Sequence, residues 1–475
     1  MRRLIFSLCF SIASMTPVFA GELKQADPRN MSFPALRFEI PKAERVVLEC
    51  GLPVYLLRDT ELPIINMTAM VRTGSVYEPA GKSGLASMTG TVMRSGGAGG
   101  LIPEKMDDEL EFMASAVESG IGSDMGTVSL TTLTKNLDRT LKIFRDVLLH
   151  PDFSDKRIEM ARRQAVEGLR RQNDDPKEIA GREVSRAIYA GHPLGLVPTF
   201  ESLGSVTRQD LLDFHRRFYR LDNMILSVSG DFERDTLVKE LNTIFGPATK
   251  KPAPPLPEIP QPQQLFQPEI IYGKKDVNQT VIRMGHLGLT KDNPDIYAVR
   301  IMDYILGGSF TSRLTMEIRT NQGLAYNVGS HFDIGRRFAG SFIAETETKA
   351  ESTIKAIKLM KEIITGMTRE PVSDQELAAA RDYMINSFMF GFTSPASIVS
   401  QRARLEFFGY PENYLEKYRD NIARVSKEDV LNAAKKYLKP GAFKLVVVGD
   451  TAKFDAPLSS LGSVRELDLK LNIPK

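Results

Sequence analysis

The order of apolar and polar positions predicts both strands and helices. Short apolar runs at 53–57 and 64–71 and the alternating segment 126–133 are typical of strands. Longer segments at 137–149, 155–171, 352–367 and 374–390 predict helices. Strands paired side by side, with helices packed on one face, form a sandwich, so we expect the α+β class with an antiparallel-rich sheet.

One pattern occurs twice, 219 residues apart. The segment VTRQDLLDFHRRFYRLDNMILSVSGDF begins at Val206 and aligns without gaps with VSKEDVLNAAKKYLKPGAFKLVVVGDT, which begins at Val425. In each copy a Thr or Ser N-cap precedes a basic amphipathic helix, and an apolar strand ends in Gly-Asp. A match that continues through helix, turn and strand indicates an internal duplication, and therefore two homologous domains.

A proline-rich segment separates the two copies. Residues 247–268 hold eight of the 27 prolines. Proline removes backbone donors and favours extended polyproline II, which predicts a semi-rigid linker. We expect an N-terminal domain at 21–246, the linker at 247–268 and a C-terminal domain at 269–475.

The first twenty residues are typical of a secretory signal peptide. Two arginines precede an apolar stretch, and Val18-Phe19-Ala20 places small residues where signal peptidase cleaves, before Gly21. The stretch is shorter than the ~20 residues that a membrane span requires, and no other stretch qualifies. Cleavage removes Cys9 and leaves Cys50 alone, which excludes an internal disulfide. We expect a periplasmic or secreted protein without a membrane span.

Composition and net charge limit the classes of partner that the chain is expected to bind. The chain is 42% hydrophobic and 25% charged, which is ordinary for a globular protein. Its 62 basic and 59 acidic side chains give a net charge of +3, too small to indicate nucleic acid or an anionic membrane as the main partner.

Three segments carry a resemblance to a known family. They are MVRTGSVYEPAGKSGLASMTGTVMRSGG from position 70, DPKEIAGREVSRAIYAGHPLGLVPTFESLGSVTRQDL from 175 and LGGSFTSRLTMEIRTNQGLAYNVGSHF from 306. They resemble the pitrilysin/insulinase zinc peptidases, which include the mitochondrial processing peptidase and bacterial relatives. The resemblance implies two homologous α+β domains that close like a clamshell around a peptide.

The zinc motif of that family is degenerate in this chain. In active members H-x-x-E-H follows Gly-Leu-Ala, so that two histidines on one helical face hold zinc and the glutamate is the general base. Here Gly84-Leu85-Ala86 is followed by Ser87 and Thr91 at the histidine positions and by Gly90 at the base position. Hydroxyl groups are poor zinc ligands at neutral pH.

The third zinc ligand of the family also has no counterpart. It is a glutamate on a second helix, and its position falls on Gly168; the adjacent Glu167 points about 100° around the helix. None of the five histidines occurs at H-x-x-x-H spacing. We therefore expect this chain to bind no metal or other cofactor, and zinc to be held by a partner subunit.

A second feature of the family is present. Its active systems use an Arg and a Tyr seven residues apart in the C-terminal domain, and this chain has Arg319 and Tyr326. By resemblance these residues bind the substrate backbone near the scissile bond, and an Arg donor with a phenol suits a peptide carbonyl. The alternative is an exposed Arg at a helix end and an ordinary core Tyr.

Three functions from different classes remain. The first is a non-catalytic, substrate-binding subunit of an exported peptidase heterodimer, in which a sister chain carries H-x-x-E-H. The second is a periplasmic peptide-binding or scaffold protein without a role in proteolysis. The third is an autonomous enzyme with unrecognised chemistry. A missing metal site together with a retained Arg/Tyr pair favours the first.

Overall fold

The fold is seen in a computed structural model that describes residues 39–246, 255–265 and 267–470. The predicted signal peptide (1–20) and part of the predicted linker (247–254 and 266) lie outside the described residues. Residues 40–475 group into one unit by their backbone contacts, and the following description concerns the described part of that unit.

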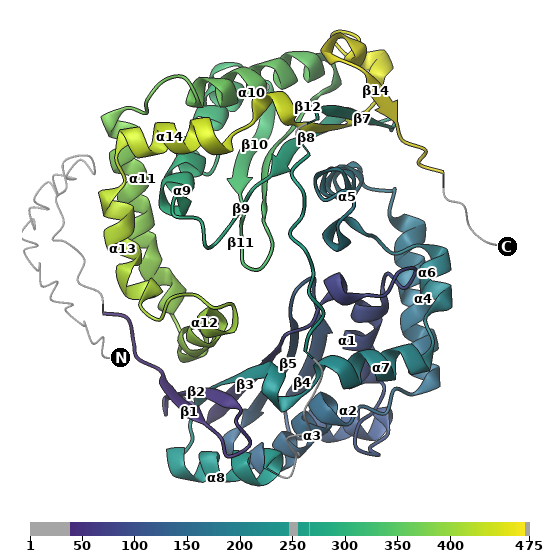
Figure 1. Cartoon of the computed structure of the whole chain (residues 1–475). Coiled ribbons are helices and arrows are strands. Elements are labelled where there is room, and N and C mark those ends of the chain that lie inside the picture. Colours follow the sequence, from purple (N-terminus) through teal and green to yellow (C-terminus); the bar gives the residue numbers. More distant parts are fainter. Residues whose placement is uncertain (1–38, 247–254, 266, 471–475) are drawn as a thin grey trace, which may run out of the picture. The chain divides into compact units, whose positions relative to one another are not determined.

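The N-terminal half contains a six-stranded sheet (Figure 1). Strands β2 and β6 are parallel and the other neighbours are antiparallel. In spatial order the strands are β1 (Glu44–Val47), β2 (Pro53–Arg58), β6 (Met224–Gly230), β3 (Ile64–Val71), β5 (Gly126–Leu133) and β4 (Ala116–Ile121).

The C-terminal half contains a second six-stranded sheet. Its strands in spatial order are β10 (Ala325–Phe332), β12 (Ser341–Lys349), β8 (Gln279–Leu287), β13 (Lys444–Gly449), β7 (Glu269–Lys274) and β14 (Val464–Glu466). From β10 to β7 they repeat the order and the directions of β4, β5, β3, β6 and β2. Two short strands, β9 (Leu289–Thr290) and β11 (Ile334–Gly335), form a separate parallel pair.

Helices cover each sheet and bury an apolar core against it (Figure 1). The helices of the N-terminal half are α1 (Leu85–Ser95), α2 (Pro103–Phe112), α3 (Leu137–Leu149), α4 (Asp155–Arg171), α5 (Pro176–Ile188), α6 (Phe200–Ser205), α7 (Arg208–Phe218) and α8 (Arg234–Phe245). Those of the C-terminal half are α9 (Ile296–Leu306), α10 (Thr353–Met367), α11 (Asp374–Ser387), α12 (Pro395–Phe407), α13 (Tyr414–Arg424) and α14 (Lys427–Tyr437). Within the described residues, no helix combines the length and the apolar character that crossing a membrane requires.

The two copies of the repeated segment adopt the same structure. Helices α7 and α14 begin and end 219 residues apart, at 208–218 and 427–437. Their N-caps, Thr207 and Ser426, each accept a hydrogen bond from the backbone three residues later in a capping box. Each helix leads to a fully buried strand, β6 or β13. The predicted duplication and the mixed α/β sandwich class are confirmed.

One pair of repeated helices packs on the opposite half of the molecule. Helix α5 is buried against β7, β8 and β13 of the second sheet, and α12 against β2, β3 and β6 of the first. These helices also lie 219 residues apart, at 176–188 and 395–407. Each therefore covers the second face of the other half's sheet, an arrangement that the sequence did not reveal. It explains why β6 and β13 are buried at every position.

Polar contacts stabilise the packing of α5 and α12, which we call the exchanged helices because each packs on the sheet of the other half. Both oxygens of the Glu406 carboxylate, on α12, accept hydrogen bonds from Arg45 at 2.7 and 2.8 Å, and Tyr55 donates a third at 2.7 Å. Lys177, on α5, pairs with Glu347 of β12 at 2.9 Å. The two halves are thus joined through two equivalent helices.

Candidate functional site

Helix α1 carries the degenerate zinc motif and is firmly capped. It begins after Gly84, whose φ of 102° requires a residue without a Cβ. The Glu78 carboxylate accepts hydrogen bonds from the Gly84 and Ala86 amides at 3.1 and 2.8 Å. Burial raises the pKa of Glu78, while these amide donors oppose the rise. Ser87 and Thr91 are exposed one turn apart on this helix, where the family places its histidines.

Gly90 occupies the general-base position and leaves no room for a side chain. It is buried against the edge strand β4, and a Cβ atom there would lie 2.5 Å from the Ile121 nitrogen and 2.9 Å from the Gly120 carbonyl carbon. The Ser119 hydroxyl also donates to the Gly90 carbonyl at 2.6 Å. A glutamate at this position would therefore require β4 to move.

The position of the third zinc ligand, Gly168, has much more space around it than Gly90 has. Gly168 lies on α4, which packs against α1, and a Cβ added there would meet nothing within 4 Å. Glu167 beside it forms an ion pair with Arg170. The structure thus has space for a metal-ligating side chain at position 168, but glycine provides no group that could bind zinc.

The described residues contain no group of three or more His, Cys, Asp or Glu side chains that could hold a metal ion. Three of the described histidines, His192, His215 and His286, are buried. Of these, His215 contacts the Leu148 carbonyl at 3.0 Å and His286 contacts the Leu287 carbonyl at 2.8 Å. Burial lowers the pKa of both to about 4. The residues at the family's zinc positions therefore do not fit zinc.

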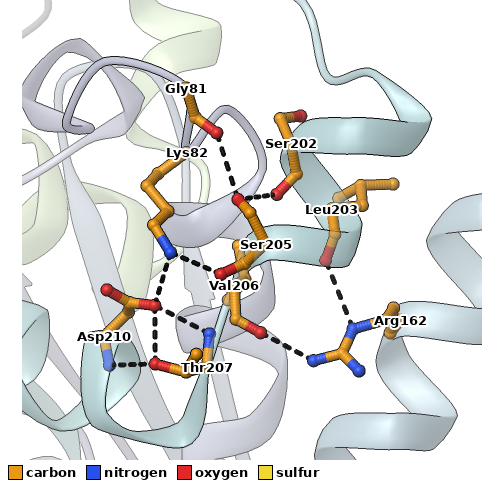
Figure 2. A network of polar contacts seen from close by, with 9 residues as sticks. All are labelled: Gly81, Lys82, Arg162, Ser202, Leu203, Ser205, Val206, Thr207 and Asp210. Atoms are coloured by element: carbon orange, nitrogen blue, oxygen red, sulfur yellow. Dashed lines mark hydrogen bonds and ion pairs between the residues drawn. The ribbon is translucent and has the colours of Figure 1, made fainter.

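Polar contacts hold together the helices around the degenerate zinc motif. Figure 2 shows Lys82, just before α1, bound to the Ser205 carbonyl and, at 2.9 Å, to the Asp210 carboxylate. Arg162 of α4 donates to the carbonyls of Leu203 and Val206 at 3.2 and 2.6 Å, at the end of α6. These contacts fix α1, α4, α6 and α7 relative to one another without any metal.

Arg319 and Tyr326 lie together on two local irregularities of the backbone. Arg319 belongs to the π-helical segment Thr315–Asn321, and Gly323, with φ of 61°, follows it. In the pairing of β10 with β12, Ala325 lies opposite Thr348 and Asn327 opposite Glu347, so Tyr326 is the extra residue of a bulge. π-Helical turns and bulges often direct side chains at functional sites.

The geometry contradicts the reading of Tyr326 as an ordinary core residue. Its side chain is 81% exposed, and the Arg319 guanidinium carbon lies 4.9 Å from the centre of its ring. The same carbon lies 5.7 Å from the ring centre of Phe310, which is also 81% exposed. The sequence pattern had not pointed to Phe310.

Neighbouring polar groups hold this cluster in place. Asp303 of α9 accepts hydrogen bonds from the Ser330 hydroxyl at 2.8 Å and the Phe332 amide at 2.9 Å, which anchors β10. Burial raises the pKa of Asp303, and the two donors oppose that rise. The Thr315 hydroxyl lies 3.1 Å from the Ser309 carbonyl and 3.2 Å from the Val328 carbonyl. Hydrogen bonds therefore connect the loop at Ser309, the π-helical segment and strand β10.

Two family models match this chain. The model described as Insulinase (Peptidase family M16) matches residues 54–198, and the one described as Peptidase M16 inactive domain matches residues 205–384. The duplicated fold and the altered zinc positions define a homologue of M16 metallopeptidases that lacks the zinc-binding residues. The chain belongs to the M16 peptidase family, the pitrilysin/insulinase family that its motifs resemble.

Relatives in this family carry different names. The uncharacterized zinc protease YmxG of Bacillus subtilis is 22% identical over 82% of this chain and 95% of its own length. The non-peptidase homolog YmxG of Helicobacter pylori is 23% identical over 85% of this chain and 93% of its own length. The second name agrees with the altered zinc positions described above.

Solved structures show the same fold. The peptidase M16 inactive domain from Pseudomonas fluorescens is 25% identical, with a TM-score of 0.79, and the match covers 88% of this chain and 100% of that one. The periplasmic protease PqqL from Escherichia coli is 16% identical, with a TM-score of 0.73, over 90% of this chain and 48% of that one. Together with the altered zinc positions, these findings indicate an inactive M16 homologue that is not catalytic alone.

Proposed function

We propose that this chain is the non-catalytic, substrate-binding subunit of an exported two-chain zinc peptidase. A sister subunit with an intact H-x-x-E-H motif supplies zinc and the general base. This chain supplies Arg319 and Tyr326, which hold the backbone of the peptide substrate.

One observation carries the proposal: Tyr326 is exposed and the half-buried Arg319 lies against its ring, where the pair is available for a ligand. The guanidinium carbon of Arg319 lies 4.9 Å from the centre of the Tyr326 ring, and among the described residues no carboxylate forms an ion pair with Arg319. A stacked guanidinium keeps its N–H groups free at its edge, where they suit a carbonyl oxygen. The phenolic hydroxyl is a second group that can donate to the same acceptor.

Export rests on the predicted signal peptide at 1–20. Cleavage before Gly21 delivers the chain to the periplasm or the medium, where it meets its sister subunit. The structurally similar PqqL is a periplasmic protease, which supports the same compartment for this chain.

The test is reconstitution with a zinc-bearing M16 chain from the same organism. We expect cleavage of a peptide mixture by the pair and none by this chain alone. Arg319→Gln should lower kcat/KM of the pair by about 10- to 100-fold, because a hydrogen bond from a charged group is lost. Tyr326→Phe should lower it less. Arg216→Gln is the matched control, since Arg216 lies on the exposed face of α7 and pairs there with Asp213.

The outcomes separate the candidate functions. Equal cleavage with and without this chain, or an unchanged kcat/KM for Arg319→Gln, contradicts the proposal. Peptide binding by this chain without any effect on the sister chain's activity would instead assign it to peptide binding or scaffolding. Hydrolysis by this chain alone would assign it an activity of its own.

A further inference from the structure

The geometry points to a binding site for a phosphate-like oxyanion at the junction of the two halves. Four arginine side chains provide its donors: Arg72, Arg336, Arg337 and Arg404. Arg72 directly follows β3 of the first half, and Arg404 lies on the exchanged helix α12. Arg336 and Arg337 lie in the loop between β11 and β12 of the second half. The inference goes beyond the proposed function and does not depend on it.

Two aromatic rings at the end of α12 bring three of these side chains together. The guanidinium carbon of Arg72 lies 4.9 Å from the ring centre of Phe407, and that of Arg336 lies 4.5 Å from the ring centre of Phe408. The two ring centres are 4.8 Å apart. Arg404 lies one turn earlier on the same helix. Positive side chains from both halves therefore lie close to the end of α12.

Protein acceptors for these guanidinium groups are few. Within the part of the chain that the structure describes, the guanidinium groups of Arg72 and Arg404 take part in no hydrogen bond or ion pair. Arg337 donates to the neutral hydroxyl of Tyr77, at 2.6 Å. Arg72 is half-buried, but none of its unpartnered nitrogens is fully enclosed, so a ligand can reach them from solvent. Since a guanidinium has five N–H donors, these side chains keep donors for a ligand.

Acidic side chains beside these arginines offset only part of their charge. Asp124 accepts a hydrogen bond from Arg336 at 3.2 Å. Glu406 attracts Arg72, but both of its oxygens already accept hydrogen bonds from Arg45, at 2.7 and 2.8 Å. Among the described residues, Arg336 is thus the one member of the cluster that pairs with a carboxylate.

Repulsion within the cluster favours the binding of an anion. Burial, and then the guanidinium of Arg337, lower the pKa of Arg72. Burial, and then Arg336, lower the pKa of Arg404 in the same way. Because arginine stays charged near neutral pH, each lowered pKa means that the folded chain holds the charge at a cost in free energy. A phosphate group has up to two negative charges and several acceptor oxygens that match the guanidinium fork, so it can offset this cost at several arginines together.

The loop that carries Arg336 and Arg337 is held through its backbone. The side chain of Gln261, in the described part of the linker, donates to the Arg337 carbonyl at 2.8 Å and accepts from the Ala339 amide at 3.2 Å. The Tyr189 hydroxyl donates to the Ala339 carbonyl at 3.1 Å. A backbone that is held before the ligand arrives reduces the entropy that binding costs.

The experiment titrates the chain from Gly21 to its C-terminus with inorganic phosphate by isothermal titration calorimetry, at an ionic strength kept constant with NaCl. Constant ionic strength separates binding from general screening. We expect saturable binding of phosphate and a Tm that rises with its concentration. Glycerol 3-phosphate distinguishes the two sources of the group. Binding as tight as that of inorganic phosphate assigns the site to a phosphate on a larger molecule, and weaker binding assigns it to the free ion.

Substitutions test the donors one at a time. Arg72→Gln and Arg404→Gln should each weaken phosphate binding about 10- to 100-fold, because each removes charge-assisted hydrogen bonds. Arg72→Lys should fall between Arg72→Gln and wild type, since it keeps the charge but loses the planar fork. Arg216→Gln is the matched control and should bind phosphate as wild type does, because Arg216 is exposed on α7 and pairs with Asp213.

Absence of saturable phosphate binding by the wild type overturns the inference, as does an affinity that neither Arg72→Gln nor Arg404→Gln lowers. In phosphate-free buffer both variants should keep a Tm close to that of wild type, because no hydrogen bond to the protein is lost. Lower Tm values there, with unchanged phosphate affinity, would assign these arginines to packing alone and also overturn the site. Arg404 is more exposed than Arg72, so its variant decides the question if Arg72→Gln fails to fold. No step measures cleavage, so a negative result leaves the proposed function unaffected.

Discussion

At the scale of single residues, two glycines on neighbouring helices show how the zinc site has diverged. Gly90 and Gly168 occupy the positions of the general base and the third ligand, yet their surroundings are opposite. Gly90 is closed in by the β4 backbone, whereas Gly168 faces open space. Of these two glycines, only Gly90 on α1 could not be replaced by the glutamate of the zinc motif without a steric clash.

This contrast gives a paired prediction. Gly90→Ala should destabilise the protein by about 1–3 kcal/mol, because its Cβ would lie 2.5 Å from backbone atoms. Gly168→Ala should stabilise it by about 0.5–1 kcal/mol, because alanine replaces glycine inside an exposed helix. Urea denaturation of both variants measures the signs. Equal effects of the two substitutions would contradict the packing described for Gly90.

The buried histidines predict how stability depends on pH. An unfolded histidine titrates near pH 6.5, whereas burial lowers the pKa of His286 to about 4. Between these values the unfolded chain binds more protons, so the stability present above pH 6.5 is lost as the pH falls toward 4. The loss is roughly 2–3 kcal/mol for His286, and His215 adds a similar amount.

The measurement is the free energy of unfolding from pH 7.5 to 4.5. His286→Gln should flatten its slope between pH 6.5 and 4.5, because the titrating group is absent. His331→Gln is the control, since His331 is exposed on β10. A slope that is the same in wild type and His286→Gln would show that this histidine does not stay neutral when folded.

At the scale of elements, the exchanged helices α5 and α12 make each sheet depend on the other half. Phe407 of α12 is 3% exposed and packs with Met70 and Ile225 on the first sheet. Phe407→Ala should cost about 3–5 kcal/mol. It should also raise hydrogen exchange in β2, β3 and β6 more than in the strands of the second sheet. Phe390→Ala, which changes a side chain that is 69% exposed, should leave exchange unchanged.

Sequence patterns predicted much of this architecture. The predicted segments 64–71, 126–133, 137–149 and 155–171 match the observed elements at both ends. The helix predicted at 374–390 is α-helical only to Ser387 and continues as a 3₁₀ turn, Phe388–Phe392. Gly391 and the extended Ser394 before Pro395 account for its end.

Three features of the structure could not be predicted from sequence patterns, each for a physical reason. An amphipathic pattern shows that one face of α5 is buried, but not that its partner is the sheet of the other half. The bulge at Tyr326 interrupts no alternation in the sequence, and the π-helical turn at Arg319 has the composition of an ordinary helix. The positions of both residues were predicted by resemblance, whereas the exposure of Tyr326 and the contact of Arg319 with its ring come from the geometry.

At the scale of the whole molecule, the two halves repeat one topology but present different groups. In the N-terminal half, Lys82 and Arg162 hold the helices around the degenerate zinc motif through protein contacts alone (Figure 2). The C-terminal half presents the Arg319–Tyr326 pair. The stability of this chain should therefore be independent of metal, while the proposed two-chain assembly should need it for cleavage.

This independence is the last prediction. A metal stabilises a protein only if it binds the folded state, and a site occupied at one hundred times its Kd adds about 2.7 kcal/mol. Because the residues at the zinc positions do not fit zinc, we expect EDTA or added zinc to leave the Tm of this chain unchanged. The same EDTA should abolish cleavage by the reconstituted pair. A zinc-dependent rise of roughly 5 °C or more in the Tm of this chain alone would reveal a metal site of its own and contradict the division of labour between the two chains.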